Sequence, residues 1–293
     1  MQETNTKKSF KDKWYKNKDF LFESTLTEGS EIQNWILNRN GWDDLKDLSI
    51  FLKNKTRILD AGCGNGRVTK LLRNSSSEST EVVGIDLVSH MVAVSNLSND
   101  HNVFFYEKDL LSDLTSLGTF DFIYSQEVLH HTKEPKDAFF NLVKLLNIGG
   151  EIAIYVYKKK APIREFTDDY VREHIIDYDY DKAMKISRDI TKLGKVLSEL
   201  HLSVNIPEIT ELGIKAGSYD IQRFFYHHFM KCYWNNELTF EENTVINYDW
   251  YHPEDCSRHT IDEIKNWFEE QNITIIYSYE DFYGITMHGK KNE

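Results

Sequence analysis

Short apolar runs and amphipathic stretches alternate along the first half of the chain. Five of the runs are rich in β-branched and aromatic residues and end at glycine or polar residues, which predicts strands. The expected strands are residues 57–61, 81–86, 102–110, 120–126 and 151–157. The stretches between them place apolar residues at helical spacing, so the pattern predicts a parallel α/β sheet.

Local signals mark the helices between these strands. Residues 67–73 and 89–98 have helical spacing. Residues 135–150 begin with Pro135, which favours a helix start, and end with a Gly-Gly pair, which predicts a helix stop.

The end of the chain supplies elements that would close the sheet. A helix is expected from Thr260, because Glu263 three residues later completes a capping-box pattern. Residues 273–279 and 284–290 then predict two strands, expected as an antiparallel pair at one edge of the sheet.

Residues 160–258 separate the fifth strand from this closing helix. Residues 162–176, 181–200 and 218–234 predict three helices, the first with Pro162 in its opening turn. The second helix carries an apolar stripe that predicts packing rather than function, formed by Ile186, Ile190, Leu193, Leu197 and Leu200.

The N-terminal segment is expected to form a helical cap, with two helices in residues 30–52 and with Trp14 and Tyr15 near the site described below. The expected organisation is a cap over residues 1–50, a first core segment over 51–159, a helical insertion over 160–258, and a closing core segment over 259–293.

Composition and charge limit the kinds of partner that the sequence predicts. The chain has 293 residues and a formal net charge of -12 at pH 7, and a phosphate backbone is bound by Lys and Arg fields, so nucleic acid is not an expected partner. No apolar run is long enough to span a bilayer, so membrane insertion is not expected either. Cys63, Cys232 and Cys256 form no Cys-x-x-Cys pair, so we expect no disulfide framework, no metal site and a reducing cytoplasm.

The stretch LDAGCGNGR, residues 59–67, is the most informative about function. A glycine-rich turn after a strand is typical of nucleotide binding. A dinucleotide site needs G-x-G-x-x-G, but here Arg67 occupies the position of the third glycine, which comes one residue early. Asp60 precedes the turn, where it would repel a pyrophosphate and attract an ammonium group.

This stretch resembles the first motif of the class I S-adenosylmethionine-dependent methyltransferases. GIDLV (84–88), EKDLL (107–111), FDFIYSQEVLHHTKEP (120–135) and LLNIGGEIAIYVY (145–157) are similar to later motifs of that family, so the resemblance covers about residues 55–160. It implies an α/β, Rossmann-like sheet, parallel with an antiparallel last strand, and a mainly helical lid inserted between the fifth strand and the last helix.

The resemblance also implies a cofactor site for S-adenosylmethionine. Asp60 would serve the ammonium group, Asp86 the ribose hydroxyls and Asp109 the adenine amine. The full set implied is Asp60, Gly62, Cys63, Gly64, Gly66, Asp86, Leu87, Asp109, Leu110 and Gln126.

In similar methyltransferases, an insertion at this point forms a substrate lid, so a small-molecule methyl acceptor is expected. The lid is rich in aromatic residues and carries cations, which suits an anionic acceptor because guanidinium fits carboxylate or phosphate. The candidates are Arg164, Arg223, His227, Tyr226 and Arg258. The alternative is a structural role in ion pairs with carboxylates such as Asp168, Asp169 and Glu173.

Methyl transfer needs a base only if the acceptor arrives protonated. Candidates after the fourth strand are Glu127, His130 and His131, although in the family residues of this segment also shape the cofactor site. Two other functions stay open: a cofactor-binding partner subunit that does not catalyse, and a relative that transfers an aminopropyl group.

Overall fold

A computed structural model describes residues 4–292 of the chain. These residues form two compact units. The core unit consists of residues 14–158 and 257–292, and the inserted unit consists of residues 4–13 and 159–256.

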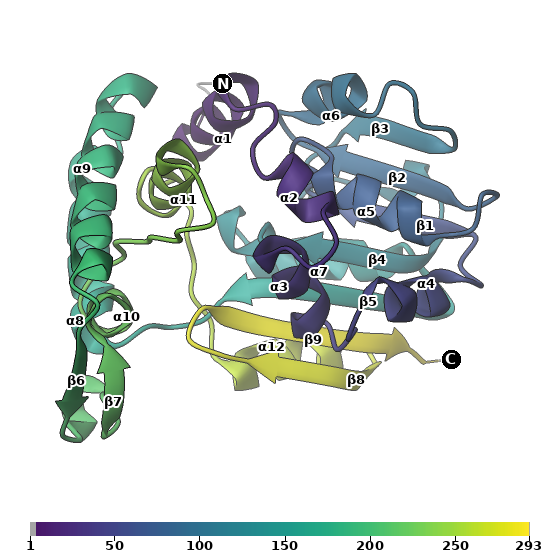
Figure 1. Ribbon diagram of the computed structural model, residues 1–293. Helices are drawn as coiled ribbons and strands as arrows, with labels where there is room; N and C mark the ends of the chain where they lie inside the picture. The colour runs from purple at the N-terminus through teal and green to yellow at the C-terminus, as the bar shows by residue number, and fades with distance from the viewer. Residues whose placement is uncertain (1–3, 293) are drawn as a thin grey trace. The chain divides into compact units, whose positions relative to one another are not determined.

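The core unit is built on a seven-stranded sheet with the strand order β3-β2-β1-β4-β5-β9-β8 (Figure 1). The strands are β1 (Arg57–Ala61), β2 (Glu81–Asp86), β3 (Val103–Glu107), β4 (Phe120–Gln126), β5 (Leu146–Tyr157), β8 (Ile273–Glu280) and β9 (Gly284–Lys291). β1 to β5 pair in parallel, whereas β9 is antiparallel to both β5 and β8. The expected class I methyltransferase fold, with an antiparallel last strand, is confirmed.

The antiparallel strand does not form the edge of the sheet. β8 lies at the edge, and because β9 is antiparallel to each of its neighbours, β8 runs in the same direction as β5. β9 is therefore inserted between two strands that it opposes. The order of these last strands in space is the reverse of their order along the chain, which the sequence pattern alone does not specify.

Helices cover both faces of the sheet. They are α2 (Phe22–Leu26), α3 (Glu31–Arg39), α4 (Leu45–Leu52), α5 (Arg67–Ser75), α6 (His90–Asn96), α7 (Pro135–Lys144) and α12 (Ile261–Glu270), with short turns η1 (Thr115–Leu117) and η2 (Leu129–His131). Alternate residues of the central strands enter two apolar clusters. Leu59 and Ile123 pack in the cluster that contains α7 and α12, and Ile58 and Phe122 pack in the one that contains α3, α4 and α5. Burial on both faces explains why these strands are continuous apolar runs.

Two helix ends differ from the sequence prediction. α7 ends at Lys144, and the glycine pair lies inside β5, where Gly149 has a φ of 74°. The cap of α12 is only half of a capping box: Thr260 accepts from the backbone N–H of Glu263, but the Glu263 carboxylate contacts Nδ1 of His259 at 2.9 Å.

The inserted unit contains α8 (Pro162–Ile175), α9 (Tyr180–Glu199), the hairpin β6 (Ser203–Ile206) and β7 (Gly217–Asp220), the turn η3 (Thr210–Leu212), α10 (Ile221–His228) and α11 (Phe240–Tyr251). The third predicted helix is shorter than expected, because its first residues pair in the hairpin. Its start is fixed instead by Asp220, whose side chain accepts from the Arg223 backbone N–H.

Most of helix α1 (Asn5–Lys16) belongs with the inserted unit rather than with the rest of the expected cap. Ser9 donates to the Tyr248 hydroxyl at 3.2 Å, and Lys13 pairs with Asp249 at 2.8 Å. These contacts with α11 explain why the chain divides near residue 13 and not at residue 50.

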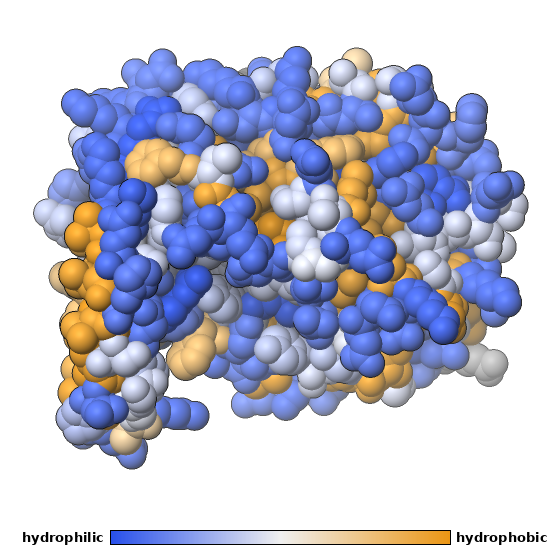
Figure 2. Space-filling view, viewed as in Figure 1, coloured by the Kyte–Doolittle hydropathy of each residue, from blue (hydrophilic) through white to orange (hydrophobic). Residues whose placement is uncertain are grey.

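The apolar stripe of α9 does not pack as predicted. Of its members only Ile190 is buried, whereas Leu200 is 56% exposed and Leu193 is also exposed. Hydrophobic side chains accordingly line the left side of Figure 2, where Figure 1 places α9. The helix instead buries a face of small and polar residues, including Ser187, Thr191 and Gly194.

Gly194 shows why that face is buried. A Cβ built at this position would lie 2.3 Å from the carbonyl oxygen of Cys232, so only glycine allows α9 to approach this segment. Asn247 reinforces the approach by donating to the Thr191 hydroxyl at 2.9 Å.

We predict that Gly194→Ala destabilises the protein. Helix propensity alone would favour alanine by about 1 kcal/mol. The backbone clash should outweigh it, giving a net loss of about 1–3 kcal/mol in the free energy of unfolding, measured in urea. Lys192→Ala, at an exposed position of the same helix, is the control and should change stability by less than about 0.5 kcal/mol. A Gly194→Ala variant more stable than the wild type would contradict the close packing.

Candidate functional site

The turn between β1 and α5 is shaped by three glycines. Gly62, Gly64 and Gly66 have φ values of 90°, 56° and 86°, in the left-handed region that other residues avoid. A Cβ at Gly62 would lie 2.3 Å from the Val128 side chain, and one at Gly64 would lie 2.7 Å from the Trp14 ring. The alternating glycines are therefore required both by backbone conformation and by close neighbours.

Asp86, at the end of β2, fastens this turn. One carboxylate oxygen accepts from the backbone N–H groups of Val88 and Ser89, at 2.9 and 2.8 Å, and the other accepts from that of Gly64 at 3.1 Å. A carboxylate can accept about four hydrogen bonds, so roughly one lone pair remains for a ligand hydroxyl. Leu87 follows directly in the loop before α6 and is half-buried.

Asp60, at the end of β1, is 2% exposed and accepts from the Thr69 hydroxyl at 2.6 Å. Burial raises its pKa to about 7, against the opposing effects of the Thr69 hydrogen bond and the Arg67 charge. The carboxyl is therefore partly protonated at neutral pH, and a cation bound beside it would draw it into the charged form.

A segment before α2 packs on the same turn. The Asn65 side-chain amide donates to the backbone carbonyls of Lys18 and Phe20, at 2.9 and 3.0 Å. Trp14 lies against Gly64, whereas Tyr15 is 43% exposed. The hydrogen bonds of Asn65 were not predicted from the sequence. Its position between two glycines of the motif was the available signal.

The third acidic position is half-buried, like Asp86. Asp109 follows β3, and its carboxylate accepts from the backbone N–H of Leu111 at 2.9 Å. Leu110 is buried in the core, and its carbonyl accepts from the Asn141 amide at 3.0 Å. Cys63 is also buried within the glycine turn, and burial raises the pKa of its thiol.

Gln126 ends β4 beside these groups. Its side-chain oxygen accepts from the Tyr124 hydroxyl at 2.6 Å. Its side-chain nitrogen is buried and has no hydrogen-bond partner among residues 4–292. A buried amide donor without an acceptor is costly, and it is one that a ligand can satisfy.

Contacts with other residues hold the segment that follows β4. Glu127 adopts a φ of 60°, and its carboxylate lies 3.6 Å from the Arg67 guanidinium. His130 is fully buried, stacks on the Tyr157 ring at 3.6 Å, and accepts at Nδ1 from the Tyr157 backbone N–H. Nδ1 therefore carries no proton, and the neutral ring holds its proton on Nε2. His131 is 8% exposed.

Three linked residues outside the predicted site anchor His130. Ser257 donates from its backbone N–H to the His130 carbonyl at 2.8 Å. The Ser257 hydroxyl lies 2.9 Å from Nε2 of His259, whose Nδ1 lies 2.9 Å from Glu263. The available signal was Glu263, which the sequence analysis assigned to the cap of α12.

The expected acceptor residues do not all lie in one unit. Arg164, Arg223, Tyr226 and His227 belong to the inserted unit, but Arg258 belongs to the core unit. The guanidinium carbons of Arg164 and Arg223 lie 4.5 and 5.9 Å from the centre of the Tyr226 ring. Burial, and then the charges of Arg164 and Arg223, lower the pKa of His227 to about 3, so His227 is neutral at pH 7.

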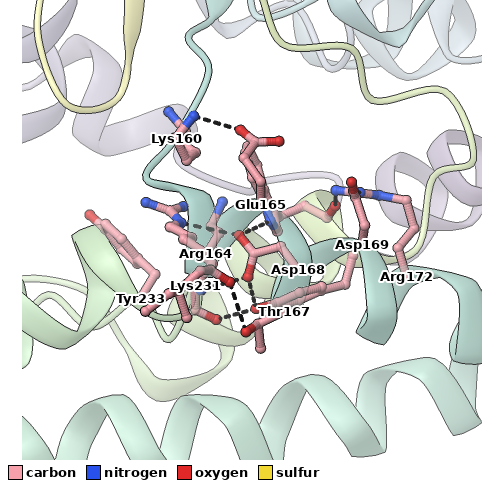
Figure 3. Close-up of polar contacts among 12 residues, drawn as sticks. Lys160, Arg164, Glu165, Thr167, Asp168, Asp169, Arg172, Lys231 and Tyr233 are labelled. Atoms are coloured by element: carbon pink, nitrogen blue, oxygen red, sulfur yellow. Dashed lines mark hydrogen bonds and ion pairs between the residues drawn. The ribbon is translucent and has the colours of Figure 1, made fainter. Parts of the chain in front are cut away.

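Arg164 also has the structural role given as the alternative, an ion pair with a carboxylate of the insertion. It is 1% exposed, and its Nε lies 3.1 Å from Asp168 (Figure 3). Asp168 accepts further bonds from Trp250, Tyr251 and the Lys231 backbone. Arg164 is thus part of a buried network, whatever else it binds.

Two broader features bear on ligands. Within the part of the chain that the structure describes, no three His, Cys, Asp or Glu side chains gather in a way that could hold a metal ion. Across residues 4–292, no helix combines the length and the apolar character that crossing a bilayer requires.

Comparison with known proteins identifies the core. Residues 59–154 match the family described as "Methyltransferase domain". The tRNA U34 carboxymethyltransferases of Shewanella frigidimarina (strain NCIMB 400) and Shewanella baltica (strain OS155 / ATCC BAA-1091) are each 33% identical, over 118 and 117 residues. Each match covers 39% of this chain but only 34% of the relative, so the chain matches about a third of the length of these proteins.

A solved structure agrees on the fold. The CurJ carbon methyltransferase superposes with a TM-score of 0.50 at 12% identity, over 92% of this chain and 58% of that one. Residues 59–154 therefore belong to the class I S-adenosylmethionine-dependent methyltransferases, and S-adenosylmethionine is the cofactor of this domain.

The raised pKa of Asp60 gives a pH prediction. If the ammonium group of the cofactor binds the charged carboxylate, affinity is full above pH 7 and falls as Asp60 becomes protonated below it. With a pKa of about 7, calorimetry should show roughly tenfold weaker binding at pH 6 than at pH 8. Asp60→Asn should bind more weakly and lose this pH dependence. The same pH dependence in the variant would show that another group titrates.

Proposed function

We propose that this protein transfers the methyl group of S-adenosylmethionine to a small acceptor that carries an anionic group. The observation that carries the methyltransferase part is the glycine turn with Asp60 at one side and Asp86 fastening it. An acidic turn suits a cofactor that has an ammonium group and no phosphate.

The residues present fit this cofactor. Asp60 offers a buried carboxylate for the ammonium, and Asp86 keeps about one lone pair for a ribose hydroxyl. The buried amide nitrogen of Gln126 is a donor that needs an acceptor. Gly62, Cys63, Gly64 and Gly66 supply the turn, and Leu87, Asp109 and Leu110, which follow the neighbouring strands, would hold the adenine.

The bound cofactor supplies an activated methyl group, so the protein contributes mainly alignment. His130 is held by Tyr157 and Ser257, which suits a positioning role. Glu127 and His131 are the better candidates for taking a proton from the acceptor. Glu127 is held in a left-handed conformation, as residues at functional sites often are.

The anionic character of the acceptor is inferred from the charges of the inserted unit. The inserted unit gathers Arg164 and Arg223 around Tyr226, in a chain whose net charge is -12. A buried cationic group of this kind supports a compact anion. The overall acidity disfavours a long polyanion, whose binding depends on a field of cations. Three buried cysteines without disulfides suit a reducing cytoplasm.

We predict that S-adenosylmethionine binds with a dissociation constant in the low micromolar range or below, about -8 kcal/mol. Asp86→Ala should weaken binding by about 10- to 100-fold, since a hydrogen bond to a charged group contributes roughly 1.5–3 kcal/mol. Asp113→Ala is the control, because this carboxylate bonds to Thr115 within its own loop, and should leave affinity unchanged. Binding of NAD in place of S-adenosylmethionine would overturn the assignment.

Product analysis separates the remaining alternatives. Formation of S-adenosylhomocysteine with a metabolite mixture is expected of the methyltransferase. A partner subunit would bind the cofactor without consuming it, and an aminopropyl-transferring relative would release a different thioether.

The similar tRNA U34 carboxymethyltransferases support a second candidate, transfer to tRNA. We expect no binding of bulk tRNA in a gel-shift assay at about 0.15 M salt, because the chain is acidic. Binding that weakens steeply with added salt, together with modification of the tRNA, would favour this second candidate.

A further inference from the structure

Five cationic side chains of the inserted unit surround two aromatic rings. Around the Trp250 ring, the charged centres of four cations lie 4.9 to 5.7 Å from the ring centre, and they belong to Lys160, Arg164, Arg172 and Lys231. Arg164 also faces the Tyr226 ring, and Arg223 is the second cation beside that ring. Arg164 is therefore shared by both rings and lies at the centre of the cluster.

The buried carboxylate at this centre is already saturated. Oδ2 of Asp168 accepts from Nε of Arg164 and Nε1 of Trp250, at 3.1 and 2.8 Å. Oδ1 accepts from the Lys231 backbone N–H at 2.9 Å (Figure 3). It also accepts from the Tyr251 hydroxyl at 2.7 Å. Four bonds use about all the lone pairs that a carboxylate offers.

Arg164 consequently has donors that Asp168 cannot satisfy. Its Nε makes the ion pair with Asp168, and its guanidinium carbon lies 4.5 and 5.2 Å from the centres of the Tyr226 and Trp250 rings. The side chain is 1% exposed, so its charge is held away from bulk water. A buried guanidinium that a saturated carboxylate holds through one nitrogen keeps donors that a bound anion can use.

We propose that the terminal nitrogens of Arg164, together with Arg223, bind an oxyanion of the methyl acceptor, a carboxylate or a phosphate. This inference rests on the proposed function for the identity of the ligand as acceptor, but the anion site itself does not. The planar guanidinium presents parallel N–H donors to two oxygens of such a group.

The surroundings favour an anion over a neutral polar group. Burial, and then the positive charges of Arg164, Arg223 and Lys160, keep the pKa of His227 low. Asp168 pairs with Arg164 and Asp169 pairs with Arg172, and a bound anion would add to this neutralisation of the positive charges. Tyr226 and Trp250 provide apolar walls that strengthen the attraction by excluding water.

Calorimetry on the full-length chain tests the site with two simple probes, inorganic phosphate and acetate, at constant ionic strength in chloride. We expect at least one probe to bind with a dissociation constant of millimolar or below. Arg223→Gln should weaken that binding about tenfold. Arg164→Lys, which keeps the charge but loses the paired donors, should weaken it by a similar factor.

Arg188→Gln is the matched control. Arg188 lies on the exposed surface of α9 and pairs with Glu241, outside the cluster, so its loss should leave both probes unaffected. Thermal unfolding of every variant shows whether the fold is kept. If Arg164→Lys does not fold, the Arg223→Gln result decides alone.

The outcomes separate the two proposals. Tighter binding of phosphate identifies a phosphorylated acceptor, and tighter binding of acetate identifies a carboxylate. Absence of binding of either probe at about 50 mM, or equal binding by Arg223→Gln and the wild type, overturns the site. S-adenosylmethionine affinity, measured on the same samples, should stay within about twofold for all variants; its absence in the wild type would overturn the methyltransferase proposal alone.

Discussion

The carboxylate of Asp86 binds backbone from two different connections of the sheet. It accepts from Gly64, in the turn after β1, and from Val88 and Ser89, in the loop after β2. The Ser89 hydroxyl completes the link by donating to the Gly64 carbonyl at 3.2 Å. The shape of the glycine turn, the start of α6 and the remaining lone pair of Asp86 are thus set together, and the other proposed cofactor groups are arranged around them.

Asp168 has the same chemistry as Asp86 but the opposite consequence. Its carboxylate is fully buried and accepts four bonds, so it has no capacity left for a ligand. Asp168 holds Arg164 through the Nε nitrogen and does not engage the two terminal nitrogens of the guanidinium. Under the proposed function, Asp86 would bind a ligand through its remaining lone pair, whereas Asp168 positions the cation that would bind one.

The sequence predicted the core well, because its strands are buried on both faces and their apolar runs depend little on distant residues. The orientation of α9 could not be predicted, since it depends on Gly194 fitting the Cys232 carbonyl and on Thr191 meeting Asn247. Cys232 and Asn247 lie far along the chain from α9. When such partners are unknown, an apolar stripe predicts a buried face. The Arg164–Asp168 spacing was visible in the sequence, but the saturation of Asp168 by Trp250 and Tyr251 was not.

The pairing of α1 with α11 has a consequence for synthesis. Thr6 donates to Asp255 across 249 residues of chain, so α1 leaves the ribosome long before its partner exists. At roughly 5–20 residues per second, the delay is on the order of 10 to 50 seconds. During that interval the helix has to remain compatible with solvent, and its sequence, NTKKSFKDKWYK, meets that need because most of its side chains are charged or polar. A segment translated early is thus among the last to be fixed in place, and completion of the inserted unit waits for the chain to reach Asp255.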